Sequence, residues 1–72
     1  MPGHRATAMG KSYVKSVGRA ASLLIALADE GREMSLTELG QKTDLHVSTV
    51  HRLAATLIVY HLMEQNQENG KY

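Results

Sequence analysis

Apolar residues recur at helical spacing in a first segment, from Val17 to Ala28. Successive members lie three or four residues apart, or next to each other, as one stripe of an α-helix requires. They are Val17, Ala20, Ala21, Leu24, Leu27 and Ala28. Ser16 is the expected N-cap residue, and Gly31 is expected just past the helix end, where glycine adopts the left-handed conformation freely. The pattern therefore predicts a helix between Ser16 and Gly31.

A capping box predicts the start of a second, shorter helix. In the stretch "SLTE" the Ser35 hydroxyl can accept from the Glu38 amide, while the Glu38 carboxylate accepts from the Ser35 amide. Leu36 and Leu39 then point inward. This helix is expected to end near residue 42 or 43.

A third helix is expected from about His46 to Tyr60. Its apolar face consists of Val47, Val50, Leu53, Ala54 and Leu57. Two helices of these lengths, joined by roughly three residues, form a helix-turn-helix.

The outward face of the third predicted helix differs from an ordinary solvated surface. A rotation of about 100° per residue places Ser48, Arg52 and Ala55 close to the point opposite Val50. Thr49, His51 and Thr56 flank them, so this face is small-sided and hydrogen-bonding, with one arginine. A solvated helix favours Glu and Lys pairs, yet the sequence from Leu45 to Tyr60 has no Asp, Glu or Lys. Because small residues allow close approach and arginine can bridge guanine O6 and N7, this face favours recognition of the DNA major groove.

The C-terminal residues predict a β-hairpin. Leu62–Gln65 reads as a short strand, Asn69–Gly70 is a turn signal, and Lys71–Tyr72 begins a returning strand. The predicted fold is thus mainly α with a small β-hairpin. It is a winged helix-turn-helix at residues 16–72, with three helices and a two-stranded wing. Because the second strand is truncated, we expect the sequence to be a piece of a longer protein.

Composition narrows the class of protein. The chain has 72 residues, an apolar share of 43%, three tyrosines as its only aromatic residues, and no cysteine. We therefore expect one small domain with an aliphatic core and no disulfide or thiolate metal site, in keeping with a reducing cytoplasm. Neither a membrane-spanning run nor a secretory signal is evident, so no membrane partner is expected.

Positive charge is concentrated near the N-terminus. Residues 1–24 carry four basic and no acidic residues, whereas residues 25–72 carry four basic and seven acidic residues. We expect residues 1–15 to form a flexible basic tail, either simply solvated or held near a polyanion. The sequence pI near 8.1 falls short of a strongly basic nucleic-acid binder. It leaves open a winged-helix module for protein contact, which the lack of an exposed aromatic or Met anchor on the third helix disfavours.

Three motifs with catalytic or metal-binding associations fail on their spacing. "GKS" at residues 10–12 lacks the phosphate-loop glycine five positions earlier, where Arg5 stands. His46 and His51 are not one helical turn apart and have no carboxylate at a ligand-like spacing. Ser48 lacks the glycines of a nucleophile elbow. We therefore expect no enzyme activity, no metal and no cofactor.

The same residues carry a family resemblance. From Lys15 to Tyr72 the chain resembles the N-terminal DNA-binding domain of the IclR family of bacterial transcriptional regulators. The matching elements are "SLTEL", "STVHRL" followed by "ATL", and the hairpin pattern "E-x-G-K-Y". Together, in this order and at this spacing, they are specific, although each alone would be weak.

The resemblance implies roles for individual residues. It implies that the helix containing Ser48, Thr49, His51 and Arg52 is the recognition helix. Together with the chemistry of its outward face, this makes Arg52 the main base-reading candidate and the other three residues its partners. It implies DNA backbone contacts from Arg19 and Ser35, to which Lys15 and Lys71 add positive charge near the phosphates. The expected partner is double-stranded DNA at an operator half-site. The family's effector-binding domain, which binds small organic ligands and supports dimers or tetramers, is absent from this sequence, so homo-oligomers and an effector are expected only of the full-length protein.

Glycine usage departs from the family pattern at three places. Asp44 and His61 stand where similar proteins carry turn glycines, and both residue types tolerate the positive φ expected there. Gly18, inside the first predicted helix, costs roughly 1 kcal/mol in helix propensity relative to alanine. The sequence offers no reason for Gly18.

Overall fold

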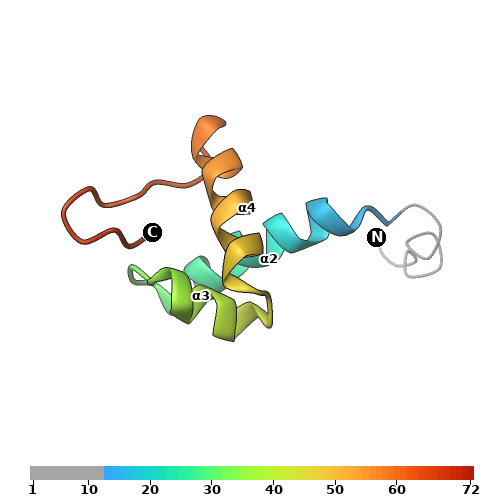
Figure 1. The fold of residues 1–72 in the computed structure, drawn as a ribbon, viewed down its shortest axis with the longest axis horizontal. Helices are drawn as coiled ribbons and strands as arrows, with labels where there is room; N and C mark the ends of the chain where they lie inside the picture. The colour runs from blue at the N-terminus through green and yellow to red at the C-terminus, as the bar shows by residue number, and fades with distance from the viewer. Residues whose placement is uncertain (1–12) are drawn as a thin grey trace.

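Three helices follow one another in the computed structural model, which describes residues 13–72. Helix α2 spans Lys15–Glu30, α3 spans Leu36–Thr43 and α4 spans Val47–Val59 (Figure 1). Each helix contacts the other two. The three predicted helices and their order are therefore confirmed. Most of the predicted tail, and the "GKS" motif, lie outside the described residues.

The end of α2 follows the prediction, but its start does not. Gly31 adopts the left-handed conformation, with φ 66°, and its amide donates to the Leu27 carbonyl. At the other end the N-cap residue is Val14, without a side-chain cap, so the predicted Ser16 cap is wrong. The Val14 carbonyl already accepts from the Gly18 amide at 3.1 Å, which places Ser16 inside the first turn.

Gly18 lies beside the Tyr13 ring, and a Cβ at position 18 would come within 2.8 Å of Tyr13 Cζ. The ring is the outer end of a side chain that is 57% exposed, so it can turn aside for a larger residue. The contact therefore does not require glycine at position 18, and the structure gives no reason for the cost in helix propensity.

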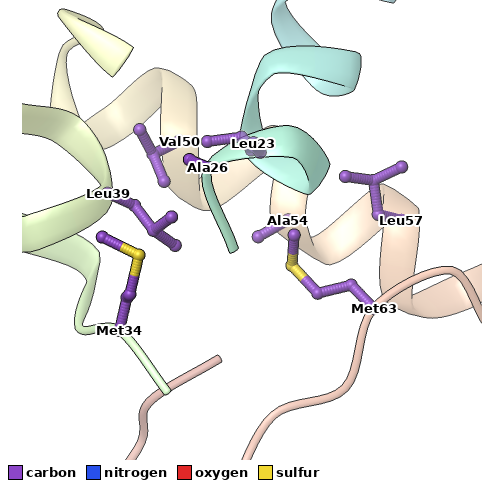
Figure 2. Close-up of a cluster of buried hydrophobic side chains, with 8 residues drawn as sticks. All are labelled: Leu23, Ala26, Met34, Leu39, Val50, Ala54, Leu57 and Met63. Atoms are coloured by element: carbon purple, nitrogen blue, oxygen red, sulfur yellow. The ribbon is translucent and has the colours of Figure 1, made fainter. Parts of the chain in front are cut away.

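The core is aliphatic, as predicted from the lack of Phe and Trp. Side chains from all three helices, and from the segments that follow α2 and α4, gather between the elements (Figure 2). They are Leu23, Ala26, Met34, Leu39, Val50, Ala54, Leu57 and Met63. The buried residues of α3 and α4, which are Leu39, Val50, Ala54 and Leu57, all belong to the predicted inward faces. Val47, also predicted to point inward, is exposed.

The buried face of α2 is rotated from the predicted stripe. Leu23 and Ala26 are buried, whereas Val17 is 65% exposed and Ala21 and Ala28 are also exposed. The predicted positions Ala20, Leu24 and Leu27 are half-buried against the core. The run "LLIALA" is apolar on more than one face, so its periodicity cannot decide which face meets α3 and α4.

The connection between α3 and α4 depends on a close backbone approach. Asp44 has φ 59° and its amide donates to the Gly40 carbonyl, which also accepts from the Leu45 amide at 3.0 Å. A Cβ on Gly40 would lie 2.9 Å from the Leu45 carbonyl oxygen. After α4, His61 has φ 61°. The positive φ predicted for Asp44 and His61 is confirmed.

The predicted β-hairpin does not form: residues 13–72 contain no strand. The loop after α4 turns at residues 66–70, where the Asn66 amide donates to the Lys71 carbonyl at 2.8 Å. Tyr72 pairs instead with Met34, through two reciprocal backbone bonds of 2.9 and 3.1 Å. Figure 1 shows this wing loop, residues 62–72, running away from α4 and coming back. A returning arm of two residues forms too few ladder bonds to define a strand with Leu62–Gln65.

Candidate nucleic-acid interface

The four predicted base-reading residues share the outward side of α4. Ser48, His51 and Arg52 are exposed and Thr49 is half-buried. The opposite side of the helix carries the buried Val50, Ala54 and Leu57, which fix its orientation. Core packing therefore determines which α4 side chains face outward.

The first turn of α4 has a side-chain cap that sequence reasoning missed. His46 is the N-cap residue, and its Nδ1 accepts from the Ser48 amide at 3.3 Å. Nδ1 also lies 2.9 Å from Ser48 Oγ. The available signal was the position of His46 directly before the helix, where side-chain acceptors satisfy free amides.

A hollow of about 240 Å³ separates the start of α2 from the outward side of α4. Arg19 and Arg52 line it together, and no carboxylate does. The full lining is Ser16, Arg19, Thr49, Arg52, Leu53 and Thr56. The fold thus brings together two arginines to which the sequence assigned different roles.

The ion pairs of the described residues lie elsewhere. Arg32 pairs with Glu30 at 3.3 Å and with Glu38 at 3.4 Å, and Lys42 pairs with Glu30 at 3.4 Å. Within residues 13–72, none of Lys15, Arg19 and Arg52 forms an ion pair. Uncompensated positive charge therefore lies on the first turns of α2 and on the outward side of α4.

Ser35 is less available for phosphate than the sequence indicated. The predicted capping box is present: Ser35 Oγ accepts from the Glu38 amide at 3.1 Å, and the Ser35 amide donates to Glu38 Oε1 at 2.9 Å. The hydrogen bond from the Ser35 amide and, to a smaller extent, the one from the Arg32 side chain lower the pKa of Glu38. Because the Ser35 amide is taken, only its hydroxyl proton can be donated to DNA.

Lys71 belongs to a wing loop held by one carboxylate. Glu33 accepts from Asn66 Nδ2 and from Asn69 Nδ2, each at 3.1 Å. Asn66 Oδ1 accepts from the Glu68 amide, and Asn69 Oδ1 accepts from the Lys71 amide at 2.9 Å. The hydrogen bonds that the Glu33 carboxylate accepts, the larger effect from Asn66 and the smaller from Asn69, lower the pKa of Glu33. Glu33 therefore holds the loop that carries Lys71. Neither Glu33 nor Lys71 lines the hollow of Arg19 and Arg52.

Among residues 13–72, no three His, Asp or Glu side chains gather closely enough to hold a metal ion. His46 instead serves as a helix cap. No described helix has the length and apolar character needed to cross a membrane.

The short α3–α4 connection and the exposed side of α4 define a helix-turn-helix domain. The IclR helix-turn-helix domain matches residues 16–67, and the chain belongs to this family of transcription regulators. The chain is also 36% identical over 59 residues to the HTH-type transcriptional regulator XynR of Escherichia coli (strain K12). That match covers 82% of this chain and 23% of XynR, so the chain spans about a quarter of the relative's length. No solved structure matches the chain.

Proposed function

We propose that this domain binds a specific sequence in double-stranded DNA, with α4 in the major groove. The observation that carries the proposal is the outward side of α4, which presents Ser48, Thr49, His51 and Arg52 without any acidic residue. Family membership supports DNA binding in general. The side-chain chemistry of α4 supports the finer statement, because hydroxyl and guanidinium groups match the hydrogen-bonding edges of bases.

The proposed contacts fall into two classes. Arg52 reads bases, assisted by Ser48, Thr49 and His51, because these residues lie on the outward side of α4. Contacts with the sugar-phosphate backbone orient the domain on the duplex. They come from four residues outside α4, which are Lys15, Arg19, Ser35 and Lys71.

We also propose that the full-length protein is a homo-oligomer with a separate effector-binding domain. The matched relative is about four times as long as the matched segment. Two copies of a helix-turn-helix can engage two half-sites, which raises affinity through effective concentration.

A second candidate function is protein contact. Three exposed apolar residues lie at and just beyond the end of α4: Val59, Tyr60 and Leu62, with Tyr60 70% exposed. The expectation that the predicted helix, His46 to Tyr60, lacks an exposed aromatic anchor is therefore wrong at Tyr60, which caps the C-terminus of α4. Exposed aromatic side chains are common anchors of protein interfaces.

Selection from a random pool of DNA duplexes separates these functions. We expect the domain to enrich one sequence, and Arg52→Ala to abolish the enrichment. Lys42→Ala is the matched control, because it removes one positive charge that is already paired with Glu30. Enrichment of no sequence, together with loss of a protein partner on Tyr60→Ala, would favour protein contact.

A further inference from the structure

The contact between His46 and Ser48 determines how the Ser48 hydroxyl can be used. Two groups of Ser48 face the same ring nitrogen, His46 Nδ1: the amide nitrogen at 3.3 Å and Oγ at 2.9 Å. Both residues are exposed at the start of α4, on the proposed DNA-binding side.

The bond from the Ser48 amide indicates which nitrogen of the His46 ring accepts. A backbone N–H can only donate, so Nδ1 must carry a lone pair and no proton. A neutral imidazole has one donor and one acceptor nitrogen, which places its proton on Nε2. With Nδ1 as acceptor, a hydrogen bond across the 2.9 Å contact can be donated only by the Ser48 hydroxyl. In that bond the only proton of the hydroxyl is engaged within the protein.

We propose that His46 fixes Ser48 as a hydrogen-bond acceptor toward DNA. The inference rests on the proposed function and adds the chemistry that this position selects. A hydroxyl with its proton engaged still offers a lone pair, which can accept only from a donor. In the major groove the base donors are the amino groups of adenine N6 and cytosine N4, whereas guanine O6 and N7 and thymine O4 are acceptors. Ser48 therefore selects a base by its amino group, and His46 is its positioning residue.

Base analogues test the proposal on the unaltered protein. Selection from random duplexes with the wild-type chain and with Ser48→Ala identifies the base pair whose preference depends on Ser48. At that pair, purine replaces adenine or 2-pyrimidinone replaces cytosine, which removes only the amino group. We expect wild-type affinity to fall about two- to tenfold, as for one hydrogen bond. Ser48→Ala should show no such loss, which controls for weaker base pairing.

Substitutions of His46 test the positioning role. His46→Asn keeps a side-chain acceptor at the N-cap and should keep the dependence on the amino group. His46→Ala removes the acceptor and releases the hydroxyl proton. We expect its dependence on the amino group to weaken and a new loss of affinity to appear when 7-deazapurine removes the N7 acceptor. Circular dichroism establishes that both variants keep their helices.

Two kinds of result overturn the proposal. One is a wild-type domain that responds to loss of N7 but not to loss of the amino group at the Ser48-dependent pair. The other is a selected sequence in which Ser48→Ala changes no preference. In both cases DNA recognition by α4 stands and only the role of the His46–Ser48 contact fails. Selection of no sequence at all overturns the proposed function instead.

Discussion

Arg19 of α2 and Arg52 of α4 line the same hollow, and neither forms an ion pair within residues 13–72. Two neighbouring guanidinium groups repel each other unless an anion lies between them. The hollow also contains hydroxyl groups, from Ser16 and Thr49, that can donate to the same anion. The fold therefore places two arginines from different helices, α2 and α4, around one hollow, both unpaired within the described residues.

Arg52→Ala and Arg19→Ala should have distinguishable effects on DNA binding. We expect Arg52→Ala to cost about 1–3 kcal/mol on the selected sequence and much less on random DNA. Arg19→Ala should weaken both DNAs alike and reduce the salt-dependence slope by about one, as loss of a phosphate contact does. Binding titrations across a salt series measure both quantities. An equal loss on both DNAs for Arg52→Ala would mean that Arg52 contacts only phosphate.

The double variant measures the coupling between the two arginines. If they act on separate parts of the DNA, the two losses in binding free energy should add within about 0.5 kcal/mol. A larger departure from additivity would mean that they share one phosphate in the hollow. Lys42→Ala, combined with either variant, provides the additive reference, because Lys42 pairs with Glu30 and does not line the hollow.

Gly40→Ala should destabilise the domain despite its helical position. Alanine gains roughly 1 kcal/mol over glycine in helix propensity. However, its Cβ would meet the Leu45 carbonyl oxygen at 2.9 Å, and the backbone of the turn must move. We expect a net loss of about 1–3 kcal/mol in the free energy of unfolding, measured with urea. The exposed neighbour Gln41→Ala should change stability by less than about 0.5 kcal/mol. A gain in stability for Gly40→Ala would show that the turn adapts freely.

Asp44→Gly should be neutral or slightly stabilising. Asp44 has φ 59°, a conformation that costs a residue with a Cβ more than it costs glycine. Thermal unfolding of the variant beside the wild type measures the difference. A loss above about 1 kcal/mol would reveal a stabilising contact of the Asp44 carboxylate.

Glu33→Gln should loosen the wing loop and reduce the acid sensitivity of the domain. The pKa of Glu33 is lowered by its bonds from Asn66 and Asn69, so its contribution to stability is present above the ordinary value of 4.5 and is lost as the pH falls through the lower folded value. The wild type should therefore lose more stability than the variant below about pH 4.5. Amide exchange at Glu68 and Lys71 should accelerate in the variant, since both amides donate to the clasping asparagines. Unchanged exchange would show that the loop holds its shape without Glu33.

Forced dimerisation should raise DNA affinity. Fusion to an unrelated dimerising helix, through a linker long enough to span two half-sites, should tighten binding to the selected sequence at least about tenfold. A fusion with a disrupted dimerising helix is the control. Equal affinity of the two fusions would contradict recognition of paired half-sites.

Local chemistry made much of the fold predictable. The Ser35–Glu38 capping box, the Gly31 helix end and the positive φ of Asp44 each depend on a few neighbouring residues, so the sequence alone contains the necessary information. The outward side of α4 was largely predictable as well, because the buried residues Val50, Ala54 and Leu57 recur at helical spacing and leave the polar positions outside.

Features that depend on distant residues were not predictable in this way. Periodicity could not orient α2, because Leu23 and Leu24 are both apolar and only contact with α3 and α4 selects Leu23. The hairpin prediction considered only the loop, whereas Tyr72 found its backbone partner at Met34. The hollow shared by Arg19 and Arg52 likewise exists only once α2 and α4 are packed together.

The reciprocal bonds between Met34 and Tyr72 join the end of the wing loop to the start of α3. Met34 directly precedes Ser35, whose cap starts α3, and Tyr72 directly follows Lys71 of the wing loop. The wing loop is therefore attached to the helical core at both of its ends: by the chain itself after α4, and by backbone bonds one residue before the α3 cap.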